Sequence, residues 1–206
     1  MGLVDDRSSQ NNMRIIDLSQ PLFHGSPHYP YDPPPALTLL NSTAKGDGAN
    51  TESITMTLHC GTHMDAPWHF HPTSEGKQAK TIDEFPLAWG YADGVVLDMT
   101  HKKPGELITV ADIQAALAKI DYQPKPLDIV LFRTDTDKLW DTMQYWTDYA
   151  GASREATIWL IDQGVKVVGT DAPGWDRPFR YQAAEYRKTQ DKSLIWEGHY
   201  AGIERE

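Results

Sequence analysis

Apolar and polar side chains alternate along residues 52–59, and this period of two is the pattern of a half-buried β-strand. Ile54, Met56 and Leu58 share one face of the predicted strand. Short apolar runs predict two further strands, at residues 14–19 and 36–40. The first part of the chain is therefore expected to be rich in strands.

Prolines dominate residues 21–35, which contain six of them and two histidines, His24 and His28. Proline lacks a backbone donor and fixes φ, so this stretch can be neither a helix nor a central strand. We expect an ordered loop or a mobile flap here.

The second half of the chain alternates between apolar strands and amphipathic helices. The predicted strands are residues 94–98, 128–132 and 165–169, and the predicted helices are residues 109–120 and 153–163. Thr109 is a suitable N-cap for the first helix, and Gly164 ends the second. This order predicts right-handed crossovers and a parallel sheet. Residues 181–187 predict a helix, and residues 193–206 a short strand and an irregular end.

These elements predict an α/β fold, or a layered β/β/α arrangement with a partly parallel central sheet. At 206 residues, the chain is long enough for one domain with its own core. We assign residues 13–206 to this single domain. Residues 1–12 are polar and unpatterned, which is typical of a disordered leader.

Charge and composition narrow the possible partners. The net charge of −10 disfavours nucleic acids and anionic membrane surfaces as partners. A small-molecule substrate remains the expected partner. No apolar run approaches the ~20 residues of a membrane span, and the polar start does not resemble a secretory signal. The single cysteine, Cys60, fits a reducing compartment. A cytoplasmic protein is therefore expected.

Four of the eight histidines lie between residues 59 and 71, and Asp65 lies among them. Imidazole nitrogen and carboxylate oxygen are common ligands of zinc and also suit manganese. Gly61 and Pro67 argue against a helix, so a strand ending at His59 and a tight turn fit better. His59, His63 and Asp65 then converge and leave coordination positions open, as in catalytic metal sites.

Other polar residues are expected to have structural roles. A buried position beside the site is the preferred interpretation of Cys60. For His71 we favour a place at the rim of the site or directly outside the metal ligands. For His24 and His28 we favour surface positions. Asp171 follows a predicted strand, where a carboxylate orients a loop by hydrogen bonds.

The motif His59–His69, HCGTHMDAPWH, resembles the HxGTHxDxPxH signature of the cyclase family of metal-dependent hydrolases. That family includes bacterial kynurenine formamidase and isatin hydrolase. Four further stretches resemble the family, so that the resemblance spans nearly all of the domain: residues 16–22, 128–134, 168–173 and 196–202.

The resemblance implies a cyclase-like fold and a role for each site residue. His59, His63 and Asp65 would hold a first divalent metal, Zn²⁺ or Mn²⁺. Asp65 would also bridge towards a second metal bound by His199. The resemblance makes His69 the general acid/base and places Phe23 against the substrate. It also implies a homodimer or homotetramer.

One feature departs from the family pattern. The family places a bridging glutamate further beyond the histidine matched by His199 than this chain extends, since Glu206 is its last residue. We therefore expect a domain that lacks the family's C-terminal tail. Such a chain should bind one metal tightly, at His59, His63 and Asp65, and a second weakly or not at all.

These observations predict a hydrolase that cleaves an amide-type C–N bond in an arylformamide, a lactam or a cyclic amide. Metal-bound water is the expected nucleophile, and His69 the expected general acid/base. The alternative is a metal-binding module without catalysis, or a degenerate relative of the family. A purely structural oligomer subunit would leave the histidine cluster without a role.

Overall fold

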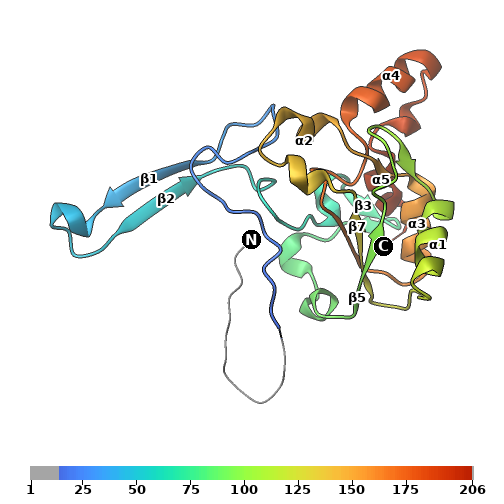
Figure 1. Cartoon of the computed structure of the whole chain (residues 1–206), viewed down its shortest axis with the longest axis horizontal. Coiled ribbons are helices and arrows are strands. Elements are labelled where there is room, and N and C mark those ends of the chain that lie inside the picture. Colours follow the sequence, from blue (N-terminus) through green and yellow to red (C-terminus); the bar gives the residue numbers. More distant parts are fainter. Residues whose placement is uncertain (1–13, 206) are drawn as a thin grey trace. The chain divides into compact units, whose positions relative to one another are not determined.

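The computed structural model describes residues 14–205 (Figure 1), so the predicted leader at residues 1–12 lies outside the described residues. Contacts divide the chain into two compact units, Met1–Met64 and Asp65–Glu206. A compact unit need not fold alone, so the assignment of residues 13–206 to one domain stays a prediction.

The first unit contains an antiparallel hairpin of β1 (Ala36–Asn41) and β2 (Thr51–Thr55). Ala36 lies opposite Thr55, and the register shifts between Leu39 and Asn41. The predicted strand at residues 36–40 is confirmed. The one predicted at residues 52–59 ends earlier, at Thr55, because β1 offers no partner beyond Ala36.

Residues 14–35 form neither helix nor strand. This confirms the predicted loop at residues 21–35, whereas the strand predicted at residues 14–19 is wrong. Side chains bind the backbone of this segment instead. The Ser19 amide donates to Asp17 Oδ1 at 2.9 Å, and the Gln20 amide to Thr62 Oγ1 at 2.9 Å. Such bonds compete with strand pairing.

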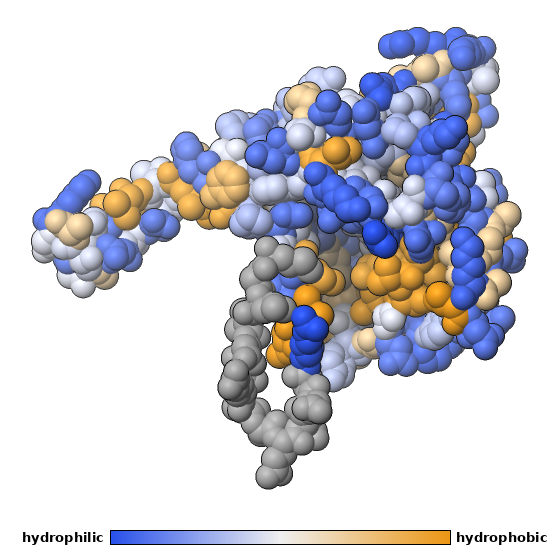
Figure 2. All heavy atoms as spheres, viewed as in Figure 1, coloured by the Kyte–Doolittle hydropathy of each residue, from blue (hydrophilic) through white to orange (hydrophobic). Residues whose placement is uncertain are grey.

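The hairpin exposes apolar side chains, which Figure 2 shows in orange along its length. Leu40 is 58% exposed, and Leu39 and Ile54 are each 47% exposed. The alternation in the sequence predicted one buried face here. Among residues 14–205 nothing buries that face, so its apolar side chains remain available for contact with another surface.

The second unit is built on a parallel sheet with the order β5–β7–β9. Its strands are Gly94–Asp98, Ile129–Arg133 and Val167–Thr170. All three match predicted strands, so the expected α/β fold with a partly parallel central sheet is confirmed. The edge strand β5 alternates, with Val95 buried and Val96 56% exposed.

Two helices pack together beside this sheet, α1 (Val110–Lys119) and α3 (Arg154–Asp162) (Figure 1). Both match predictions. Ile113 and Leu117 of α1 and Leu160 of α3 are buried in the same core. The strands contribute the rest of the apolar layer: Val95, Leu97, Val130 and Phe132.

Both helices begin at the residues that the sequence indicated. Thr109 Oγ1 accepts from the Asp112 amide at 3.3 Å, and Asp112 Oδ2 accepts from the Thr109 amide at 2.8 Å. This is a reciprocal capping box. Ser153 Oγ accepts from the Ala156 amide at 3.1 Å. After α3, Gly164 has a φ of +85°, a conformation that favours glycine.

The capping box of α1 predicts a loss of stability on mutation and a pH dependence. Thr109→Ala should lower the free energy of unfolding by about 1 kcal/mol, while Thr109→Ser, which keeps the hydroxyl, should not.

The hydrogen bonds from Thr109 and Lys102 hold the pKa of Asp112 below its ordinary value of 3.8, against the opposing effect of burial.

The folded-state pKa is depressed, so the contribution of Asp112 is present above about pH 4 and declines as the pH falls through the folded pKa. Urea unfolding of the wild type and of Asp112→Asn, at pH 7 and at pH 3, measures this contribution to the free energy of unfolding. A difference between the two proteins that grows towards pH 3 would contradict this sign.

The remaining elements surround the sheet of the second unit. Two short strand pairs are β3 (Thr73–Ser74) with β4 (Lys77–Gln78), antiparallel, and β6 (Leu107–Ile108) with β8 (Gly151–Ala152), parallel. The other α-helices are α2 (Met143–Thr147), α4 (Phe179–Thr189) and α5 (Glu197–Tyr200). Short 3-10 turns occur at Thr43–Lys45, Pro67–His69, Ile82–Glu84, Leu87–Gly90, Thr136–Leu139, Lys192–Leu194 and Ala201–Ile203.

The C-terminal part departs from its prediction in one respect. The helix predicted at residues 181–187 is present as α4. The strand expected within residues 193–206 is wrong, since residues 192–203 form α5 and two 3-10 turns. Within residues 14–205, no helix is both long and apolar enough to cross a membrane.

Candidate metal centre

The motif His59–His69 is an irregular segment that ends in a single 3-10 turn, Pro67–His69. Gly61 has a φ of +72°, which explains a glycine at this bend. Pro67 opens the 3-10 turn, and Ala66 before it is extended, as the residue before a proline prefers to be. The segment is therefore a turn, as predicted, and it contains the point where the two compact units join in the chain.

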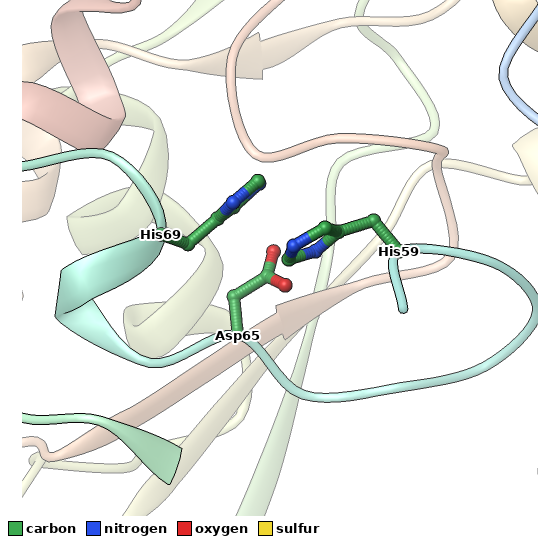
Figure 3. A group of neighbouring side chains, drawn as sticks. All are labelled: His59, Asp65 and His69. Atoms are coloured by element: carbon green, nitrogen blue, oxygen red, sulfur yellow. The ribbon is translucent and has the colours of Figure 1, made fainter. Parts of the chain in front are cut away.

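Three side chains of this motif point towards one another (Figure 3): His59, Asp65 and His69. Each offers one ligand atom, and these atoms all lie within 4.8 Å of one another. All three residues are exposed, so water and a small molecule can reach them. Two imidazole nitrogens and one carboxylate oxygen form a donor set that fits Zn²⁺ or Mn²⁺.

His63 lies next to His59, and their ring centroids are 5.4 Å apart at an interplanar angle of 70°. Its Nδ1 contacts the Gly61 carbonyl oxygen at 2.9 Å. Because a carbonyl only accepts, Nδ1 is the donor and Nε2 is the nitrogen suited to a metal. Among the described residues, the group of potential ligands holds His69 rather than His63. The predicted ligand role of His63 stays a prediction.

His199 lies in α5, outside that group. Its ring stacks on Phe70 at a centroid distance of 3.7 Å, and its side chain is 18% exposed. Its Nδ1 pairs with Asp176. The predicted role of His199 as a second metal ligand also stays a prediction. Sequence analysis missed Asp176, whose only signal was its place in the GWDRP stretch that follows β9.

Phe23 lies in the first unit, in the segment without regular structure, and its side chain is 45% exposed. Ser26 orders the backbone here: the Phe23 amide donates to Ser26 Oγ at 2.6 Å. This exposed position is compatible with the predicted contact to a substrate.

A second group of carboxylates has a structural explanation. Asp135, Asp137 and Asp171 each offer an oxygen within 4.8 Å of the others. Asp171 accepts from the backbone amides of Thr134 and Asp135, each at 2.8 Å. Burial raises the pKa of Asp171 above its ordinary value, although these hydrogen bonds oppose the shift. The expectation that Asp171 orients a loop is confirmed.

His71 is 4% exposed, and its Nδ1 contacts the Thr73 carbonyl oxygen at 2.8 Å. Burial lowers the pKa of this imidazole below its ordinary value, which favours the neutral form. His71 is therefore a buried structural histidine, so the predicted place at the rim is wrong, while a place directly outside the ligands stays a prediction.

Sequence comparison reveals two relationships. Residues 16–177 match the model of a protein family described as "Putative cyclase". The chain is 31% identical to a kynurenine formamidase from Erythrobacter litoralis over 176 residues, which are 82% of this chain and 70% of the relative. The residues that match the family model include the whole motif His59–His69.

Solved structures resemble this one as well. Isatin hydrolase A from Ralstonia solanacearum superimposes with a TM-score of 0.75 and 24% identity, covering 93% of this chain and 76% of that protein. At this identity the likeness concerns the fold alone. A "predicted metal-dependent hydrolase" from Bacillus stearothermophilus superimposes with a TM-score of 0.59 and 25% identity, covering 91% of this chain and 78% of that protein.

Proposed function

Because this chain belongs to the cyclase family, we propose that it is a metal-dependent hydrolase that cleaves an amide-type C–N bond. Its substrate class is an arylformamide, a lactam or a cyclic amide. The relative from Erythrobacter litoralis supports this class, since a formamidase cleaves a formamide. The products are a carboxylate and an amine.

The proposal rests above all on the grouping of His59, Asp65 and His69, whose potential ligand atoms lie within 4.8 Å of one another. Imidazole nitrogens and carboxylate oxygens converge in this way at metal sites. Because these side chains are exposed, a substrate has room to bind beside them. His63 completes the proposed first ligand set with His59 and Asp65. Zn²⁺ and Mn²⁺ both suit this set.

When bound, the metal supplies a water of lowered pKa and polarises the substrate carbonyl. His69 accepts the proton of the attacking water and returns it to the leaving nitrogen. Its ring lies beside Phe70, with centroids 4.5 Å apart at 77°. This packing and the 3-10 turn at Pro67–His69 restrict where the imidazole can point, which a general base requires. Phe23 contacts the substrate.

We also propose a cytoplasmic homodimer or homotetramer. The exposed leucines of the β1–β2 hairpin support self-association, because a second copy would remove them from water. The mass in solution, measured by sedimentation, tests this part of the proposal.

A hydrolysis screen of the metal-supplemented protein tests the proposed reaction. The panel holds N-formylkynurenine, isatin, a cyclic imide and a lactone, and each is assayed with Zn²⁺ and with Mn²⁺. We expect turnover of at least one amide substrate and its loss on chelation. Bound metal without turnover of any substrate would favour the non-catalytic metal-binding module. If the protein shows neither bound metal nor turnover, a purely structural subunit would be favoured.

A further inference from the structure

Asp176 is a carboxylate buried within the second unit, with 1% of its surface exposed. Its Oδ1 accepts from the Gly198 amide at 2.6 Å, and its Oδ2 accepts from the His199 amide at 3.2 Å and pairs with His199 Nδ1. A buried carboxylate is costly unless its oxygens are hydrogen-bonded. Here all three donors come from the first turn of α5.

These contacts define the protonation pattern of the His199 ring. An ionised carboxylate only accepts hydrogen bonds, so Nδ1 carries the proton in this pair. The neutral imidazole then has its lone pair on Nε2. We propose that Asp176 is a positioning residue that fixes His199 as the Nδ1–H tautomer and presents Nε2 to a divalent metal. The metal part of this statement rests on the proposed function.

Aromatic neighbours fix the orientation of the same ring. Phe70 stacks on it at 24°, and Trp196 lies edge-on at 84° with centroids 6.2 Å apart. The hydrogen bond to Asp176 sets the rotation of the ring within this packing. His199 is thus held in one position without a metal, and little side-chain freedom remains to be lost when an ion binds.

The backbone around the pair is tightly fitted. A Cβ at Gly198 would lie 3.0 Å from Trp175 Cδ1 and 3.1 Å from Asp176 Oδ1, so glycine allows this close approach. The fully buried Gln182 joins the same two segments. Its Nε2 donates to the Arg177 carbonyl at 2.5 Å, and its Oε1 accepts from the Trp196 amide at 2.7 Å.

Such an arrangement has a known consequence for metal binding. A metal-ligating histidine commonly donates its other ring N–H to a carboxylate, which fixes the tautomer and makes the ligand nitrogen more basic. Loss of this partner typically weakens metal affinity by about 10–100-fold. We expect Asp176→Asn to weaken metal binding at His199 by about 10–100-fold.

The first test uses the metal-free wild-type chain labelled with ¹⁵N at histidine. Spectra at mildly alkaline pH report which ring nitrogen carries the proton, and His199→Gln identifies the signals of His199. We expect a protonated Nδ1, an unprotonated Nε2, and a shift of the Nε2 signal when Zn²⁺ is added. A protonated Nε2, an equal mixture of tautomers, or an Nε2 signal that Zn²⁺ leaves unchanged would overturn the proposal.

The second test separates positioning from folding. Asp176→Asn should weaken Zn²⁺ binding in the wild-type background but not in His199→Gln, if Asp176 acts through His199. Equal weakening in both backgrounds would overturn the proposal.

Asp128→Asn is the matched control. Asp128 is also 1% exposed and accepts from the Lys125 amide at 3.0 Å and the Tyr122 hydroxyl at 2.8 Å. Asp128→Asn should lower the free energy of unfolding but leave the ¹⁵N spectrum of His199 unchanged.

The two proposals can fail separately. If the hydrolysis screen is negative while the tautomer is as expected, the proposed function fails and the positioning role of Asp176 stands.

Discussion

Alanine at His59, His63 or Asp65 is expected to lower bound metal and abolish hydrolysis together. Each variant removes one of three proposed ligands, and the attacking water loses its acidity when the ion is lost. The loss of activity should exceed the ~10–100-fold that an outer-shell partner typically costs. Metal analysis after desalting, followed by the hydrolysis assay on the same sample, measures both quantities.

His24→Ala is the matched control for these variants. His24 is an exposed histidine outside the motif, and its Nδ1 accepts from the Leu37 amide at 3.2 Å. It should keep both metal and activity. Full metal content in all three motif variants would contradict the proposed first site. Retention in His63→Ala alone would favour His59, Asp65 and His69 as the ligands, in line with their grouping in the structure.

His69→Ala is expected to keep near-normal metal content while kcat falls by about 10²–10⁴-fold, the usual contribution of a general acid/base. A base that takes the proton of the attacking water would have to lie close to the residues that would hold the metal. The separation of up to 4.8 Å within the group therefore fits a base as well as a ligand. Metal content distinguishes these two roles.

Added imidazole provides a further measurement on His69→Ala. If His69 is the acid/base, free imidazole should restore part of the lost activity at unchanged metal content. A metal loss as large as that of His59→Ala would show that His69 is a ligand instead.

The parallel sheet and its helices could be predicted because their signals are local. The strands around Val130 and Val168 are short apolar runs, and Thr109 and Ser153 stand directly before helical periodicity. Each signal lies within a few residues of the structure that it specifies. The helix and strand boundaries in this part of the chain were therefore predicted within a few residues.

Elements that depend on distant partners were predicted less well. Residues 14–19 contain a short apolar run that predicted a strand, but the amide of Gln20 bonds to Thr62, far along the chain, and no strand forms. The alternation at Ile54 indicated a buried face, yet this side chain is 47% exposed. Periodicity shows which side chains share a face but not whether anything covers it.

The candidate site shows the same limit. The spacing of His59 and Asp65 indicated convergence, and the structure brings their ligand atoms close together. The pair of Asp176 with His199 was beyond sequence reasoning. Gly198, the first partner of Asp176 in α5, lies 22 residues further along the chain, and only the fold brings the two segments together.

The connections of the parallel sheet also determine when it forms during synthesis. The β1–β2 hairpin joins neighbouring strands and can close within about 1–10 μs. By contrast, 30 residues of chain lie between Asp98 at the end of β5 and Ile129 at the start of β7. At 5–20 residues per second, the ribosome needs roughly 1.5–6 s to make that stretch. Val95 and Leu97 therefore have no partner strand for seconds after they are made.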